Sequence, residues 1–341
     1  MLDNSVQILE LVMKTAIQFL QENENRVLNL TTISRDLIVF KDQMKVRQLE
    51  KEYVDQIKGD TIRTADGRPR KLLGRSVKVE KGMKEGVVTK IMYLSPANES
   101  GFNLCKFALG CKWACLGHSA GRMVYTQSKW SRVLKTWYMK SAPVAFFKQL
   151  IREIVNHAIN VKKRYPGKIP AIRLNGSSDI VWPRYIDIDA LCDIIRFEYG
   201  ISLKFYDYTK YPIKVYRKQL EAAKMPFPKQ YHLTFSIDEK FRSLAFARQW
   251  LEAGFNATMV VGSTTRTLKD AKKAQEFLLK QGTIHINGSD YKTINHDLTD
   301  IRFRDPRGTV GILHAKGSKA LNDRSGFVFM VDKEYGPLSI Q

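Results

Sequence analysis

The stretch "AIRLNGSSDIVWPRYIDIDALCDIIRFEYGISLKFYDYT" (residues 171–209) decides the fold, because it has the pattern of strand, helix, strand. Apolar runs predict strands at 171–176 and 202–209, and apolar residues at helical spacing predict a helix over 186–199. Two strands joined by a helix form a right-handed βαβ unit, in which the strands are parallel. The sequence therefore predicts an α/β protein.

The same alternation continues on both sides of this stretch. It predicts a mainly parallel sheet in about six βα units, arranged as a full or partial (βα) barrel, with a doubly wound open sheet as the alternative. The further elements expected are strands at 86–97, 231–236, 256–262, 300–303 and 309–315, and helices at 143–165, 212–223, 238–254 and 267–282.

The part of the chain before this alternation is different. Residues 1–57 are expected to form a helical N-terminal region, with helices over 5–22 and 44–57. Residues 58–85 are rich in Gly, Lys and Arg and predict a basic linker or arm. The barrel-like domain is then expected over residues 86–341.

Composition and charge limit the class of protein and its partners. The chain has 341 residues, of which 44% are hydrophobic, as in a globular protein. A net charge of +22 attracts polyanions, so we expect a nucleic acid or a nucleotide as partner. No apolar run reaches the ~20 residues of a membrane span and no secretory signal is evident. We therefore expect no membrane association and a cytoplasmic location.

Three of the four cysteines lie together in "NLCKFALGCKWACLGH" (residues 103–118). The spacing is Cys105-x5-Cys111-x3-Cys115, with His118 a further x2 along. These four residues would complete a zinc tetrahedron, whereas the three cysteines alone would hold three irons of a [4Fe–4S] cluster and leave the fourth open. The segment follows the first expected strand of the parallel sheet, and loops at the carboxyl ends of such strands build active sites.

A cysteine loop in this place resembles the radical S-adenosylmethionine enzymes. Their motif is Cys-x3-Cys-x2-Cys, and "CKWACLGH" matches it at Cys111 and Cys115 but has His118 at the third position. A second assignment uses Cys105, Cys111 and Cys115 as the ligands and leaves His118 outside the cluster. The resemblance implies a [4Fe–4S] cluster and S-adenosylmethionine as cofactors.

Residues 72–332 also resemble the bacteriophage gene product 88 family. The resemblance rests on "YLSPANESGFNLC", "CLGHSAGRM", "RLNGSSDI", "FYDYTKYP", "YHLTFS" and "GILHAKGSKALNDRSGFVF". It implies a phage origin, and hence the host cytoplasm as location, but no activity. The first 71 residues lie outside it.

Polar residues at the ends of the other strands are the remaining candidates. We expect catalytic roles for Asp179, Asp207 and Lys316, and cofactor binding by Asn175, Ser177, Ser236 and Lys316. Asp207 and Tyr206 alternate on one strand, so at most one of them lies inside a barrel. The sequence contains no phosphate-binding P-loop, no His-Glu-x-x-His and no Gly-x-Ser-x-Gly motif.

Two functions of different class follow from these observations. The first is a phage-encoded iron–sulfur protein, a radical S-adenosylmethionine-type enzyme that acts on a nucleic acid or nucleotide. The second is a non-catalytic, nucleic-acid-binding phage protein in which Cys105, Cys111, Cys115 and His118 hold a structural zinc ion.

Overall fold

The computed structural model describes residues 16–37, 57–58, 61–62, 70–75, 77–115, 117, 121–238, 241–331 and 339–340. His118 and most of the helix expected at 44–57 lie outside these residues.

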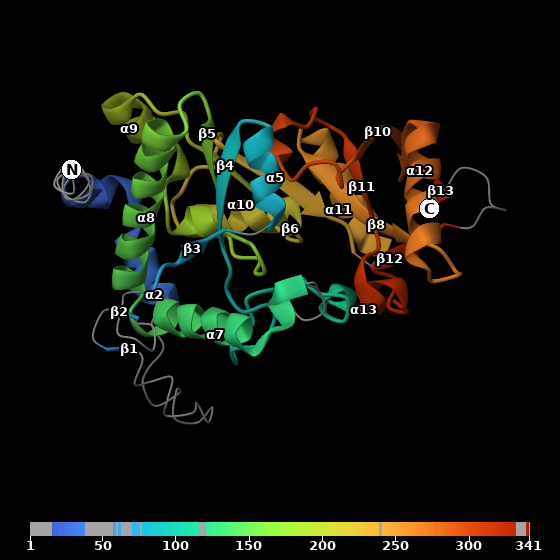
Figure 1. The fold of residues 1–341 in the computed structure, drawn as a ribbon, viewed down its shortest axis with the longest axis horizontal. Helices are drawn as coiled ribbons and strands as arrows, with labels where there is room; N and C mark the ends of the chain where they lie inside the picture. The colour runs from blue at the N-terminus through green and yellow to red at the C-terminus, as the bar shows by residue number, and fades with distance from the viewer. Residues whose placement is uncertain are drawn as a thin grey trace.

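A large mixed sheet forms the centre of the molecule (Figure 1). It has eleven strands in the order β13-β9-β10-β11-β8-β7-β6-β5-β4-β3, with β12 paired to β8 beside this path. A two-stranded sheet of β1 (Ile57–Lys58) and β2 (Thr61–Ile62) is separate. The strands of the large sheet are β3 (Leu73–Gly74), β4 (Val87–Met92), β5 (Ile169–Arg173), β6 (Lys204–Thr209), β7 (Tyr231–Ser236), β8 (Asn256–Gly262), β9 (Thr283–Ile286), β10 (Ser289–Asn295), β11 (Val310–His314), β12 (Val328–Met330) and β13 (Ser339–Ile340).

The six central strands, β4, β5, β6, β7, β8 and β11, are parallel and stand side by side in chain order. The predicted α/β class and mainly parallel sheet are confirmed. The prediction of a full barrel is wrong. The sheet has β3 as the outermost strand on one side and β13 on the other, and these two strands do not pair with each other in the described chain. The order of the six central strands does not reverse, and such a reversal defines a doubly wound sheet.

Helices connect the strands and begin and end where the sequence signals it. α8 begins at Pro143, whose missing N–H costs nothing in a first turn. The Asp187 carboxylate accepts the Ala190 N–H at the start of α9, and Gly200, with φ of 64°, ends it. The helices are α2 (Leu30–Leu37), α5 (Val77–Lys84), α7 (Thr126–Ser141), α8 (Pro143–Arg164), α9 (Ile188–Tyr199), α10 (Ile213–Ala222), α11 (Phe241–Glu252), α12 (Leu268–Gln281) and α13 (Gly317–Leu321), with residues 16–27 also helical and short 3₁₀ turns η1 (Gly110–Lys112), η2 (Gly121–Val124), η3 (Trp182–Arg184) and η4 (Arg302–Arg304).

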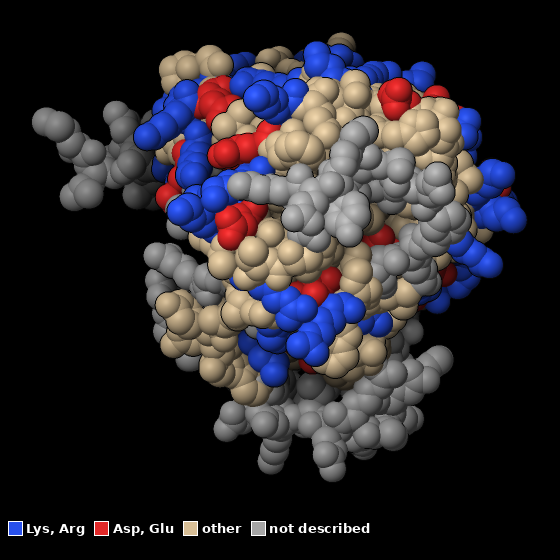
Figure 2. Space-filling view, turned by 90° about the vertical axis from the view of Figure 1, so that its right-hand side faces the viewer, with Lys and Arg blue, Asp and Glu red and all other residues tan. Residues whose placement is uncertain are grey.

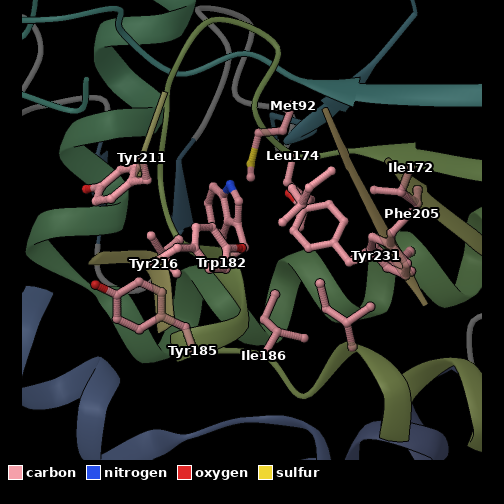
Figure 3. Packing of buried hydrophobic residues seen from close by; sticks show 14 of the residues in the cluster. Met92, Ile172, Leu174, Trp182, Tyr185, Ile186, Phe205, Tyr211, Tyr216 and Tyr231 are labelled. Atoms are coloured by element: carbon pink, nitrogen blue, oxygen red, sulfur yellow. The ribbon is translucent and has the colours of Figure 1, made fainter. Parts of the chain in front are cut away.

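The main core lies between one face of the sheet and these helices. Phe205 and Tyr231, from neighbouring strands, pack edge to face with ring centroids 6.3 Å apart. Trp182 and Ile186, from the loop after β5, fill the space beside them (Figure 3). All four residues are at most 1% exposed, so this face of the sheet is sealed against water.

The prediction of a strand at 300–303 is wrong, because this segment contains the start of the 3₁₀ turn η4. Its apolar side chains are buried against the second face of the sheet instead of entering a ladder. Ile301 packs in a cluster with Val87, Ala171 and Tyr206, and the Phe303 ring lies 5.6 Å from that of Tyr206. Apolar residues at the alternate positions 301 and 303 are compatible with a strand or a turn, and packing against the sheet selects the turn.

The last part of the predicted basic arm is integrated into the sheet. β3 pairs antiparallel with β4, and the Glu153 carboxylate of α8 accepts the N–H groups of Leu72 and Leu73 at 2.9 Å each. Leu72 and Leu73 are at most 2% exposed. The assignment of residues 58–85 as a linker, with domain boundaries at 57 and 85, remains a prediction. In the described part of the chain, no helix has the length and apolar character needed to cross a membrane.

Candidate metal and cofactor site at the carboxyl edge of the sheet

The cysteine loop, residues 93–115 and 117, follows β4 and crosses the side of the sheet at which the parallel strands end. Figure 1 shows this segment in teal along the lower side of the molecule, from α7 to α13. Ala114 packs in a small buried cluster with Ala315 after β11, Ala320 of α13 and Val328 of β12. The loop therefore spans from the first central strand to the last, as the predicted position at the carboxyl ends requires.

Contacts with the loops after β5 and β6 hold the cysteine loop in place. The Ser177 hydroxyl donates to the Leu94 carbonyl at 2.5 Å, and the Asp179 N–H donates to the Leu104 carbonyl at 2.9 Å. The Phe107 ring lies 4.6 Å from that of Tyr211. Ser177, predicted to bind a cofactor, thus has its hydroxyl engaged with the cysteine loop.

Arg132 of α7 joins the two ends of the cysteine loop by hydrogen bonds to both. Its guanidinium donates to both Glu99 carboxylate oxygens, at 3.1 and 2.8 Å, and to the carbonyls of Gly117 and Met123, at 3.1 and 3.0 Å. Arg132 is 2% exposed, and its carboxylate partner stands in the same buried environment. A cavity of about 280 Å³ lies beside this pair, lined also by Gly117, Met123, Val124 and Lys129.

The three thiols of the loop lie near one another but do not converge. None of the chain's four cysteines, all of which the structure describes, is in a disulfide. The Ala97 N–H donates to Cys105 Sγ at 3.3 Å. Burial, with smaller contributions from Asp179, Cys115 and Cys111, raises the pKa of Cys105 to about 12, although the Ala97 N–H lowers it. No three His, Cys, Asp or Glu side chains among the described residues stand close enough to hold a metal ion.

Asp179 lies between the cysteine loop and the end of β6. Its Oδ2 accepts the Lys210 N–H at 2.9 Å, while its buried Oδ1 makes no hydrogen bond of normal geometry. Burial raises the pKa of Asp179 to about 6, against the Lys210 N–H and the Thr209 hydroxyl, which lower it. A carboxylate kept ionised against burial and with an unused oxygen is typical of a functional site.

Lys210 joins this site to β7. Its Nζ donates to the Ser236 hydroxyl and to the Ser236 carbonyl, at 3.1 Å each. The ammonium also stands 5.0 Å from the centre of the Phe327 ring. Two of the predicted residues, Asp179 and Ser236, are thus linked through Lys210, which the prediction of catalytic and binding residues did not include.

Asp207 and Asn175 make hydrogen bonds that hold the surrounding strands and loop in place. Asp207 Oδ2 accepts from the Leu174 and Asn175 N–H groups and from the Tyr231 hydroxyl, at 2.7, 3.1 and 2.7 Å. Asp207 is fully buried, with Arg173 Nε 3.6 Å from its Oδ1. The Asn175 carboxamide binds the Ile180, Ser178 and Trp182 groups of its own loop.

Lys316 belongs to a second cluster, at the ends of β10 and β11. Its ammonium pairs with Asp297 Oδ1, and His314 Nδ1 lies 2.6 Å from Asp297 Oδ2. Gln275 of α12 also donates to Asp297 Oδ2, at 3.0 Å. Lys316 has a 42% exposed side chain. The structure brings Lys316 and His314 of the same strand end together with Asp297, a carboxylate that strand-end position did not indicate.

Aromatic side chains in and after the cysteine loop divide between the core and the surface. Trp137 and Tyr138 of α7 are 1% exposed and belong to the core. Tyr125 is 59% exposed, and Trp113, within the cysteine loop, is 75% exposed. These two rings are therefore available for contact with a partner.

A family model described as Gene product 88 matches residues 67–330 of the chain. This range agrees with the extent expected from the sequence motifs. No curated protein and no solved structure matches the chain.

Proposed function

This chain belongs to the gene product 88 family, and we propose that it is a phage-encoded iron–sulfur protein, a radical S-adenosylmethionine-type enzyme that acts on a nucleic acid or nucleotide. The observation that carries the proposal is the position of the cysteine loop, which lies across the carboxyl ends of six parallel strands in chain order. A partial barrel has this strand order, and its active site lies at this edge.

The cysteine loop fits an iron–sulfur cluster by the chemistry of its donors. Thiolates are the ligands of such clusters, and the electrostatic influence of Cys111 and Cys115 on Cys105 places all three in one neighbourhood. An amide that donates to a cysteine sulfur, as Ala97 does to Cys105, is a known means of tuning such centres. Because the described residues do not form a closed ligand group, binding has to draw the three thiols together.

Cys105, Cys111 and Cys115 would hold such a cluster, which would supply a binding site for S-adenosylmethionine and one-electron chemistry, as the resemblance implies. Asp179, with an unbonded oxygen beside Cys105, would hold a cationic or hydroxyl group of the cofactor. Lys210, fixed by Ser236, would hold a carboxylate or phosphate. Lys316 with Asp297 and His314 would bind substrate at the far end of the same edge.

Surface charge supports a nucleic acid or nucleotide as substrate. Figure 2 shows Lys and Arg side chains in several patches over the side that carries α12, with acidic side chains between them. Lys269, Lys272, Lys273 and Lys280 of α12 are exposed. Cations neutralise phosphates, and exposed rings such as Trp113 and Tyr125 stack on bases. We propose the host cytoplasm as the place of action.

The metal and acid-labile sulfide content of protein purified without oxygen tests this proposal. We expect about four irons and four sulfides per chain, and an absorption spectrum that S-adenosylmethionine perturbs. Cys105→Ser, Cys111→Ser and Cys115→Ser should each lose the cluster. Cys192→Ser is the matched control, because the Cys192 thiol is buried in α9 and donates to the Leu203 carbonyl. Protein without iron and sulfide would refute the proposal.

The second candidate is a non-catalytic nucleic-acid-binding protein with a structural zinc ion on Cys105, Cys111, Cys115 and His118. The exposed Trp113 beside these thiols favours it, since a binding protein needs accessible rings at its interface. One zinc and no sulfide per chain would select this function. His118→Ala should then release the metal and destabilise the protein, whereas an iron cluster on the three cysteines should survive this change.

A further inference from the structure

We propose that a second ligand site, for a nucleoside monophosphate group, lies at the opposite edge of the sheet. A cavity of about 410 Å³, which we name the amino-edge pocket, is lined by the first residues of β7, the start of β8 and the segment around η4. Because the central strands are parallel, this edge is the one remote from the cysteine loop. The volume lies within the range of about 300–1,000 Å³ usual for small-molecule sites.

The charge of the amino-edge pocket favours an anion. Lys229, Arg302 and Arg307 contribute three positive charges and Asp305 one negative charge, which leaves +2 on its lining. Arg302 is 2% exposed, its Nε has no hydrogen-bond partner among the described residues, and its Nη1 stands 3.2 Å from Asp305 Oδ2 without a hydrogen bond of normal geometry. Lys229 and Arg307 are exposed, so their charges are accessible to a ligand.

The same pocket offers planar apolar walls. The Phe227, Phe255 and Phe303 rings line it, and the His232 ring lies 5.9 Å from that of Phe303. Burial, together with the charges of Lys204 and Arg307, lowers the pKa of His232 to about 4. His232 is therefore neutral at pH 7, so it presents an uncharged ring.

An anion binds to cations, and a flat heteroaromatic ring stacks on aromatic side chains. A nucleoside monophosphate carries both groups at the spacing of one sugar, which suits a pocket of this size. It can be a free nucleotide or the 5′-phosphorylated end of a nucleic acid strand. This site requires neither the cysteine loop nor a metal, so its test and the test of the proposed function can fail separately.

Isothermal titration calorimetry of the full chain with AMP, GMP, CMP and UMP tests the site. We expect at least one nucleotide to bind, with ribose 5-phosphate and the matching nucleoside each at least tenfold weaker. Arg307→Gln and Lys229→Gln should each weaken binding of that nucleotide at least tenfold. Arg304→Gln is the matched control, because Arg304 is exposed on η4, donates to the Glu85 carbonyl and does not line the pocket.

The proposal is overturned if none of the four nucleotides binds at millimolar concentration. It is also overturned if ribose 5-phosphate binds as tightly as the nucleotide, or if Arg304→Gln weakens binding as much as Arg307→Gln. A 5′-phosphorylated oligothymidylate and its unphosphorylated form distinguish the two sources. Tighter binding of the phosphorylated strand than of the free nucleotide identifies a strand end, and the reverse order identifies a free nucleotide.

Discussion

Replacing Asp179 with Asn should stabilise the protein at neutral pH. The substitution removes a charge that is buried beside the cysteine loop. The Lys210 N–H that Asp179 Oδ2 accepts can be accepted equally by an amide oxygen. The new NH₂ group takes the position of Oδ1, which has no hydrogen bond of normal geometry, near the Thr209 hydroxyl, which can accept one.

The size of the stabilisation expected in Asp179→Asn follows from the pKa of Asp179. Burial raises it from 3.8 to about 6, so the folded state binds this proton more tightly than the unfolded state does. Stability from this group is therefore present below pH 4 and is lost as pH rises to 6. A difference of 2.2 pH units at 1.36 kcal/mol per unit is about 3 kcal/mol, an upper limit for the gain in Asp179→Asn above pH 7.

Urea unfolding of both proteins at pH 4.5, 5.5, 6.5 and 7.5 measures this gain, which should grow with pH. Asp207→Asn is the contrasting variant. Burial also raises the pKa of Asp207 to about 6, but its partners are all donors, Arg173 among them. An amide NH₂ has no acceptor there, so Asp207→Asn should destabilise the protein. A pH-independent loss of stability in Asp179→Asn would refute the reasoning.

Three further outcomes are expected from equilibrium unfolding. Gly311→Ala places a Cβ 2.0 Å from the buried His296 imidazole and should lower the free energy of unfolding by at least about 1–3 kcal/mol. Gly74→Ala, whose Cβ would lie 3.9 Å from the nearest atom, should lower it by under about 1 kcal/mol. Equal losses in the two variants would contradict this packing. Arg132→Met should lower the free energy of unfolding by about 3–5 kcal/mol, because it removes the guanidinium that pairs with the buried Glu99 carboxylate and joins the ends of the cysteine loop, whereas Arg196→Met, in an exposed ion pair, should lower it by under about 1 kcal/mol. Burial lowers the pKa of His157 to about 4, so this side chain is neutral in the folded protein at pH 7. The free energy of unfolding should therefore fall by up to about 3 kcal/mol as pH decreases from 6.5 to 4. His157→Gln should remove that part of the pH dependence.

The elements that sequence predicted well are those with a local signal. β7 and β8 match their predicted limits, residues 231–236 and 256–262, because β7 alternates apolar and polar residues, β8 is largely apolar, and each lies between two helices. The hairpin of β9 and β10 was missed, although Asn287-Gly288 between them is a typical two-residue turn with φ of 46° and 85°. Its strands carry mostly polar residues, so hydrophobic pattern alone does not reveal them.

The candidate site was predicted by position and missed in its contacts. Short cysteine spacing and the preceding strand were enough to place Cys105 and its neighbours at the carboxyl edge. The packing of Ala114 on Ala315, two hundred residues further along the chain, depends on the whole sheet, so no local pattern indicates it. The same is true of Asp297, which reaches Lys316 only because β10 and β11 are neighbours.

Asp179 and Asp207 show why the end of a strand does not by itself identify a catalytic carboxylate. Both are buried at the same edge, and burial raises the pKa of both to about 6. Three donors bind Asp207 Oδ2, and Arg173 Nε stands 3.6 Å from an Oδ1 that makes no hydrogen bond of normal geometry, so Asp207 holds the end of β5 in place. Asp179 has one backbone donor on Oδ2, the Thr209 hydroxyl close by and the Cys105 thiol as a neighbour, and its Oδ1 makes no hydrogen bond of normal geometry. The neighbours of the two carboxylates, and not the pKa, therefore distinguish them: the Arg173 guanidinium pairs with Asp207, whereas Asp179 lies beside the cysteine loop.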